Sequence, residues 1–145
     1  MDISESVNNP AIEIKSTIKN DARIHSLSIN QISYFQTNEE ALLASVIIYK
    51  DEKGQSCRDI CRKILSKTSK DSLGYKYIQS MLIMLTDKHP FSTDLYNLKK
   101  TFDSIRFYSP TSTFKELSLK PSGNWLKGGS INIDVEALPQ STLDL

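Results

Sequence analysis

Hydrophobic and polar positions divide the chain into short segments, and the most apolar of these is residues 73–85. Side chains there recur at the spacing of a helix: Tyr77, Ile78, Met81, Leu82 and Leu85. Ile83 and Met84 extend the apolar arc almost around the helix, which is typical of a buried helix. The pattern therefore predicts a buried central helix, capped at its start by Asp71 or Ser72.

A second helix is predicted at residues 57–68. Its apolar positions follow the i, i+3, i+4, i+7, i+8 rule: Cys57, Ile60, Cys61, Ile64 and Leu65. Ser56 is a suitable N-cap, and basic residues occupy the opposite face. This is the most regular amphipathic pattern in the chain.

Two strands are predicted before these helices, at residues 11–18 and 23–29, and Asn20-Asp21 between them favours a turn. We expect the two strands to form a hairpin. Ile24 breaks the alternation set by Leu27 and Ile29, which indicates a bulge or a shifted start. A third strand is predicted at residues 43–50, followed by a turn at residues 51–54.

The remaining segments are shorter. Thr37 and Glu40 fit a capping box for a helix beginning near Asn38. A further helix is expected after Ser92 or Thr93, with one apolar face formed by Leu95, Leu98, Phe102 and Ile105. A short strand is indicated by Phe114, Leu117 and Leu119, and a late strand by the alternation of Ile131, Ile133 and Val135.

Strands, then helices, then strands predict an α+β fold. We expect a single compact domain at residues 11–138, in which the N-terminal hairpin and later strands pack on about three helices. Residues 1–10 and 139–145 are expected to be a flexible arm and a flexible tail.

The formal net charge of +1 conceals an uneven distribution of charge. Residues 50–120 hold 14 Lys and Arg against 8 Asp and Glu, a net charge of +6. Such a region can contact an anionic membrane surface or RNA, although it can also be an ordinary solvated helix surface. The candidate residues for anion or partner binding are Arg58, Arg62, Lys63, Lys67, Lys70, Lys99 and Lys100.

Cysteine usage and the N-terminus bear on the compartment. Cys57 and Cys61 are the only cysteines, and they lie on one helical face, so we expect reduced thiols in the cytoplasm or another reducing compartment. The N-terminus resembles no signal peptide, and the longest apolar run is too short to span a membrane.

Candidate chemistry is sparse. A thiol nucleophile or a zinc site would need His25 or His89 to approach Cys57 and Cys61, and the spacing does not support this. The glycines around Trp125 lack the lysine of a phosphate-binding loop and precede no predicted helix. We therefore expect no enzymatic activity, no cofactor, no metal and no small-molecule substrate.

A pattern of elements resembles the core of rhabdovirus-type matrix proteins: the strand at 46–49, the turn at Lys53-Gly54, the basic helix at 57–68 and the aromatic-led helix at 75–85. The resemblance implies an assembly protein, but it transfers no functional residue, and the budding motifs of that family are missing from this sequence.

The sequence thus favours a non-enzymatic assembly or interaction protein. It would self-associate or bind a protein partner, and its basic helix face would be available to an anionic surface. The alternatives are a secretion-type or regulatory chaperone that binds a polypeptide along strand edges, and a small nucleic-acid-binding regulator.

Overall fold

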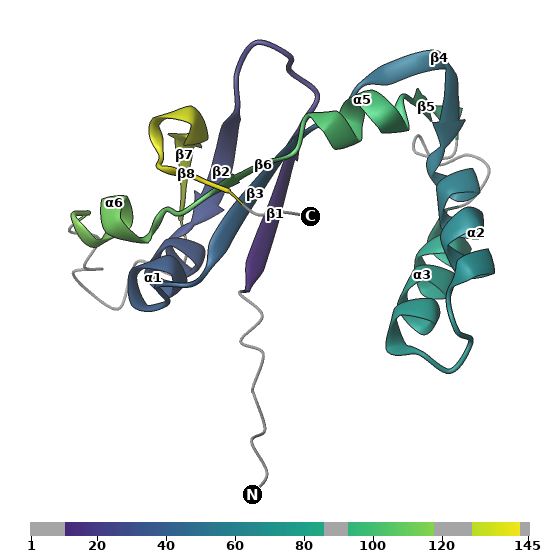
Figure 1. The fold of residues 1–145 in the computed structure, drawn as a ribbon, viewed down its shortest axis with the longest axis horizontal. Coiled ribbons are helices and arrows are strands. Elements are labelled where there is room, and N and C mark those ends of the chain that lie inside the picture. The colour runs from purple at the N-terminus through teal and green to yellow at the C-terminus, as the bar shows by residue number, and fades with distance from the viewer. Residues whose placement is uncertain (1–10, 86–92, 118–128, 143–145) are drawn as a thin grey trace, which may run out of the picture. The chain divides into compact units, whose positions relative to one another are not determined.

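The computed structural model describes residues 11–85, 93–117 and 129–142 (Figure 1). They form an α+β fold, as predicted, with strands and helices in mixed order. Contacts within the chain divide it into two compact units. Unit 1 comprises residues 1–47 and 104–145, and unit 2 comprises residues 48–103. The hydrophobic pattern does not predict this division.

Unit 1 is built on a four-stranded sheet in the order β1 (Ile12–Thr17), β3 (Leu42–Ile47), β6 (Arg106–Tyr108) and β8 (Gln140–Ser141). β1 runs parallel to β3, and the other neighbours are antiparallel. A separate antiparallel pair is formed by β2 (Ile24–Ser28) and β7 (Ser130–Asp134). Among the described residues of unit 1, the helical elements are α1 (Ile29–Thr37), α6 (Thr111–Lys115) and the 3-10 turn η1 (Val135–Ala137).

The core of unit 1 lies among β2, β3, β6, α1, α6 and η1. Its buried residues are Leu27, Ile32, Phe35, Ala41, Leu43, Tyr108, Phe114, Val135 and Leu138. Phe35 and Phe114 meet edge to face with ring centroids 5.9 Å apart, which joins α1 to α6. α1 begins in a capping box, in which Ser28 and Gln31 satisfy each other's backbone amides.

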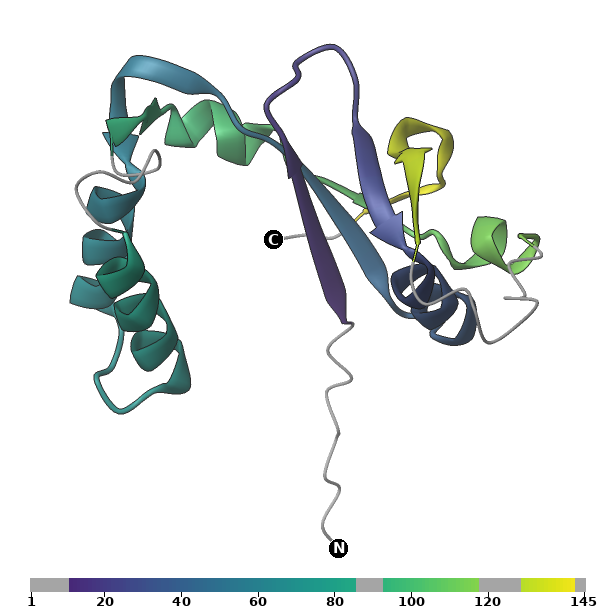
Figure 2. The same ribbon diagram turned by 180° about the vertical axis from the view of Figure 1, so that it is seen from behind.

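The described part of unit 2 consists of β4 (Lys50–Ser56), α2 (Cys57–Lys67), α3 (Leu73–Met84), β5 (Leu95–Tyr96) and α5 (Leu98–Asp103). β4 pairs with β5 in antiparallel fashion, with a register shift between Lys50 and Gln55. Gly54 passes so close to the Tyr96 backbone that no side chain would fit there. α2 and α3 lie side by side (Figures 1 and 2).

Several predicted elements are confirmed. The strands predicted at 11–18, 23–29 and 43–50 correspond to β1, β2 and β3. Ser56 caps α2 and Ser72 caps α3, because each side-chain oxygen accepts a hydrogen bond from the amide three residues later.

Other local predictions are wrong. The N-terminal hairpin does not form, because β1 pairs with β3 and β2 pairs with β7. No helix begins near Asn38, which is instead the C-cap of α1. Residues 51–54 continue strand β4 through its register shift rather than forming a separate turn.

Three further corrections concern the C-terminal half. The segment expected as a helix after Ser92 first forms β5, and its helix α5 begins only at Leu98. Phe114 lies in helix α6 rather than in a strand. Residues 140 and 141, expected in a flexible tail, form β8 against β6. The predicted arm at 1–10 and the segment around Trp125 lie outside the described residues.

Candidate interaction surface

Helix α3 is not buried, which overturns the prediction of an enclosed central helix. Four of its apolar residues are exposed: Leu73 by 84%, Tyr77 by 68%, Met81 by 40% and Met84 by 75%. At 100° per residue these four side chains fall within an arc of about 80°, so they form one stripe along the helix. We call this stripe the α3 face. Ile83, 75% exposed, lies beyond it.

The helix packs by a different stripe of similar width. Tyr75, Ile78 and Leu82 are half-buried and Leu85 is buried, on the side of α3 that meets α2. The apolar residues of α3 therefore belong to two different faces of the helix. Described residues cover the packed face but not the α3 face. Contiguous exposed apolar surface of this kind usually marks an interaction site. Lys76 is the only charged residue between Leu73 and Met84.

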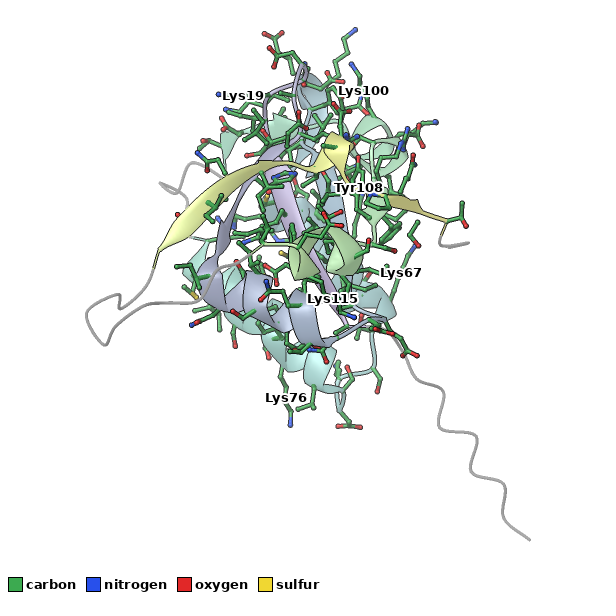
Figure 3. All side chains as sticks on the ribbon, turned by 90° about the vertical axis from the view of Figure 1, so that its left-hand side faces the viewer. Lys19, Lys67, Lys76, Lys100, Tyr108 and Lys115 are labelled. Atoms are coloured by element: carbon green, nitrogen blue, oxygen red, sulfur yellow. The ribbon has the colours of Figure 1, made fainter. Side chains whose placement is uncertain are left out.

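The seven predicted basic residues all belong to unit 2, where they lie on α2, in the connection that follows it and on α5. Arg58 and Arg62 flank one side of the apolar stripe of α2, while Lys63 and Lys67 flank the other side. Lys70 is exposed in the connection between α2 and α3. Figure 3 shows Lys67 and Lys100 at different heights of the molecule, with Lys100 near the top.

Local partners engage several of these cations. Arg62 pairs with Asp59 at 3.3 Å, and Lys99 pairs with Asp103 at 2.7 Å. Lys63 donates to the side-chain oxygen of Gln55 at 2.6 Å. The Lys100 ammonium lies 4.2 Å from the centre of the Tyr49 ring, which is a cation–π contact. Four of the seven basic residues thus have neighbours of their own, which reduces the charge that they offer to an anionic ligand.

A serine–histidine contact is present in unit 1. Nε2 of His25 lies 2.7 Å from Oγ of Ser45, and Nη1 of Arg23 donates to that same Oγ at 3.0 Å. Arg23 also donates to the backbone carbonyls of Ser45 and Ser104. Burial and the nearby Arg23 and Lys15 cations lower the pKa of His25, which favours the neutral imidazole.

This geometry is structural rather than catalytic. A nucleophilic serine must reach a substrate, but Ser45 is fully buried, and its oxygen already accepts a hydrogen bond from Arg23. The arrangement joins β2, β3 and Ser104, which lies two residues before β6, through polar contacts inside the unit. Sequence analysis missed this network. The sequence did contain an indication of it in the broken alternation at Ile24. Side chains alternate along a strand, so a strand that buries Leu27 also buries His25 and exposes Ile24.

Thiol and metal chemistry gain no support from the described part of the chain. Cys57 is half-buried and Cys61 is buried. Burial, followed by the nearby Cys61 and Asp94, raises the pKa of the Cys57 thiol, so the reactive thiolate is disfavoured. No group of three or more His, Cys, Asp or Glu residues that could hold a metal occurs among the described residues. His89 lies outside them.

A polar cavity of about 410 Å³ opens in unit 1. Its polar lining comprises Arg23, Arg106, Tyr108, Glu136 and Gln140. The Glu136 carboxylate lies 3.9 Å from Nε of Arg23 and offsets part of the positive charge. Since the terminal nitrogens of Arg23 already donate to the protein, the cavity gives no clear indication of an anionic ligand.

Comparison of the chain with protein-family models, curated proteins and solved structures finds no match. The resemblance to rhabdovirus-type matrix proteins therefore stays a prediction. Among the described residues, no helix has both the length and the apolar character needed to cross a bilayer.

Proposed function

We propose that this chain is a non-enzymatic assembly protein that self-associates through the α3 face. The observation that carries the proposal is the exposed stripe of Leu73, Tyr77, Met81 and Met84 on a well-capped helix. An amphipathic helix that leaves such a stripe in water is expected to bury it against another apolar surface.

A second copy of α3 suits this stripe. In an antiparallel pair of α3 helices, Leu73 of one copy would lie opposite Met84 of the other, and Tyr77 would lie near Met81. Thioether–aromatic contacts between Met and Tyr are favourable. The lone charge on the helix, Lys76, would lie opposite Met81 rather than opposite another lysine. The stripe is therefore self-complementary, as a two-fold interface requires.

The expected affinity is modest. Complete burial of an exposed Leu, Tyr or Met side chain contributes about 1.5–3 kcal/mol. The free energy gained by burying a few such side chains is offset by the cost of association, about 4–15 kcal/mol of lost translational and rotational freedom. Self-association should therefore depend strongly on protein concentration and should be sensitive to a single substitution in the stripe.

Anion binding by the basic residues stays a separate and weaker proposal. Unit 2 holds 11 Lys and Arg against 7 Asp and Glu, a net charge of +4. The ion pairs of Arg62 and Lys99 reduce the charge available to a ligand. The chaperone and nucleic-acid regulator hypotheses stay predictions without a specific observation in their favour.

Light scattering or sedimentation across a range of protein concentrations tests the proposal. The wild type should gain mass with concentration, and Tyr77→Lys should weaken this association. Gln79→Lys is the matched control, because it adds the same charge to an exposed, polar part of α3. Equal association by the two variants would reject the α3 face, and a wild type that stays monomeric throughout would reject self-association.

A further inference from the structure

Strand β1 forms one edge of the four-stranded sheet and presents an unusual side-chain pattern. Its alternation is inverted, because Ile12 and Ile14 are 42% and 67% exposed whereas Glu13 and Lys15 are half-buried. In Figure 2, β1 lies beside β3 as a long, regular strand. An exposed, regular edge strand is a ready template for pairing with another strand.

The backbone of β1 is oriented for such pairing. The amide of Leu42 in β3 donates to the carbonyl of Ala11 at 2.9 Å. Because peptide groups alternate in direction along a strand, those of Ile12, Ile14 and Ser16 point away from β3. At this edge, among the described residues, β3 is the only strand that pairs with β1.

The charges on the other face of β1 have a simple order. Glu13 and Lys15 lie two residues apart and form an ion pair at 3.2 Å. Gln31 of α1 holds both side chains, since its amide donates to Glu13 and accepts from Lys15. The strand thus carries one negative and one positive side chain, symmetrically placed about Ile14.

We propose that β1 pairs antiparallel with β1 of a second copy, in the register that places Ile14 opposite Ile14. In this register the outward peptide groups of Ile12, Ile14 and Ser16 meet one another. Glu13 of each copy lies opposite Lys15 of the other, in the non-hydrogen-bonded positions where side chains approach most closely. Both copies contribute the same strand, so the interface is isologous.

Charge selects this register over its neighbours. Shifting the centre to residue 13 places Glu13 opposite Glu13, and shifting it to residue 15 places Lys15 opposite Lys15. Directly opposed like charges destabilise a strand pair, whereas opposite charges stabilise it. Only the register centred on Ile14 combines matched backbone groups with two opposite-charge pairs.

The β1 interface is independent of the α3 face, which belongs to unit 2. A chain with one two-fold interface forms dimers, whereas a chain with two different two-fold interfaces can extend into open assemblies. The wild type should therefore form species larger than dimers. A variant with only one intact interface should stop at dimers.

Charge exchange tests the register. In a Tyr77→Lys background, which removes the α3 interface, Glu13→Lys and Lys15→Glu should each weaken dimerisation about tenfold, because both cross-strand pairs become like-charged. An equimolar mixture of these two variants should recover dimers, since a strand with two lysines then pairs with a strand with two glutamates. The double exchange Glu13→Lys/Lys15→Glu should also recover them. Circular dichroism checks that each variant is folded.

Each outcome decides the proposal. Recovery in the mixture and in the double exchange supports β1 pairing in this register. Dimers that are unaffected by the single exchanges, no recovery in the mixture, or a Tyr77→Lys protein that is monomeric at every concentration would overturn it. The alternative hypothesis is that Lys15 protects the sheet edge from pairing with another strand. Under that hypothesis, neither Lys15→Glu nor Glu13→Lys changes the molecular mass measured for the Tyr77→Lys protein. The α3 proposal is judged separately by Tyr77→Lys against Gln79→Lys.

Discussion

The buried network of Arg23, His25 and Ser45 gives a quantitative prediction about unit 1. Nη1 of Arg23 donates to both the Oγ and the carbonyl of Ser45, and Nη2 donates to the carbonyl of Ser104. All four residues are buried. Because water cannot replace these contacts in the folded state, removing either Arg23 or Ser45 should leave polar atoms without partners.

The magnitudes follow from the bonds that are lost. Ser45→Ala removes an oxygen bonded to Arg23 and His25, which should lower the free energy of unfolding by about 1–3 kcal/mol. Arg23→Met deprives two backbone carbonyls of a charged donor and should cost about 3–5 kcal/mol. Since both substitutions remove the same bond between Nη1 and Oγ, the double variant should be less destabilised than the sum by about 1–2 kcal/mol.

A double-mutant cycle measures this coupling. Urea unfolding of the wild type, both single variants and the double variant can be followed through the methyl signals of Ile32 and Leu43, which report on the core of unit 1. Additive effects, with a coupling below about 0.5 kcal/mol, would refute the network. Small effects of both single substitutions would show that neither side chain is buried as described.

Two further predictions concern burial. The pKa of His25 is lowered in the folded chain, so the neutral imidazole contributes its full stability above the unfolded pKa of about 6.5. That contribution should be lost as the pH falls through the folded pKa, at no more than about 1.4 kcal/mol per pH unit. Urea unfolding between pH 7.5 and 5.5 should show this loss in the wild type but not in His25→Gln, and a gain of stability on acidification would contradict the prediction. In dilute, monomeric protein, Tyr77→Lys should change the free energy of unfolding by no more than about 0.5 kcal/mol, because Tyr77 is exposed. Leu85→Ala should lower the free energy of unfolding by about 2–5 kcal/mol, because Leu85 is buried. A large loss of stability in Tyr77→Lys would restore the buried-helix hypothesis.

Some predictions from the sequence were reliable because the contacts behind them are local, although the capping box expected from Thr37 and Glu40 was not among them. Ser56 and Ser72 cap helices because a serine oxygen reaches an amide three residues along the same chain. The alternation at Ile131 and Ile133 likewise marks β7, which pairs with β2, although Val135 of the same predicted strand lies in η1. Such features depend on neighbours in sequence and need no knowledge of the tertiary fold.

Strand pairing and burial could not be read in the same way. The parallel pairing of β1 with β3 joins residues 30 apart, and nothing in either strand excludes the hairpin we expected. In α3, apolar residues on nearly every side predict enclosure, but periodicity cannot distinguish a face that packs on α2 from a face left exposed. The same ambiguity makes the α3 face informative, because exposed apolar residues indicate a surface that a partner can cover.

The sequence shows which region of the chain carries excess positive charge, but it does not show whether those charges form one binding site. All seven candidate residues fall within unit 2, but four lie on α2, Lys70 lies in the connection after it, and Lys99 and Lys100 lie on α5. Counting charges along the chain identifies the excess of positive charge, but it does not show which cations are already paired. Arg62 pairs with Asp59 and Lys99 pairs with Asp103, each within about one helical turn.

Methionine oxidation offers the most direct measurement of the α3 face. Met84 and Met81 are 75% and 40% exposed, so dilute hydrogen peroxide should oxidise them readily in monomeric protein. At concentrations where the protein self-associates, mass spectrometry should find both residues protected, and the Tyr77→Lys variant should lose that protection. Slow oxidation in dilute protein, or equal rates at all concentrations, would contradict the claim that α3 presents an exposed face to a second copy.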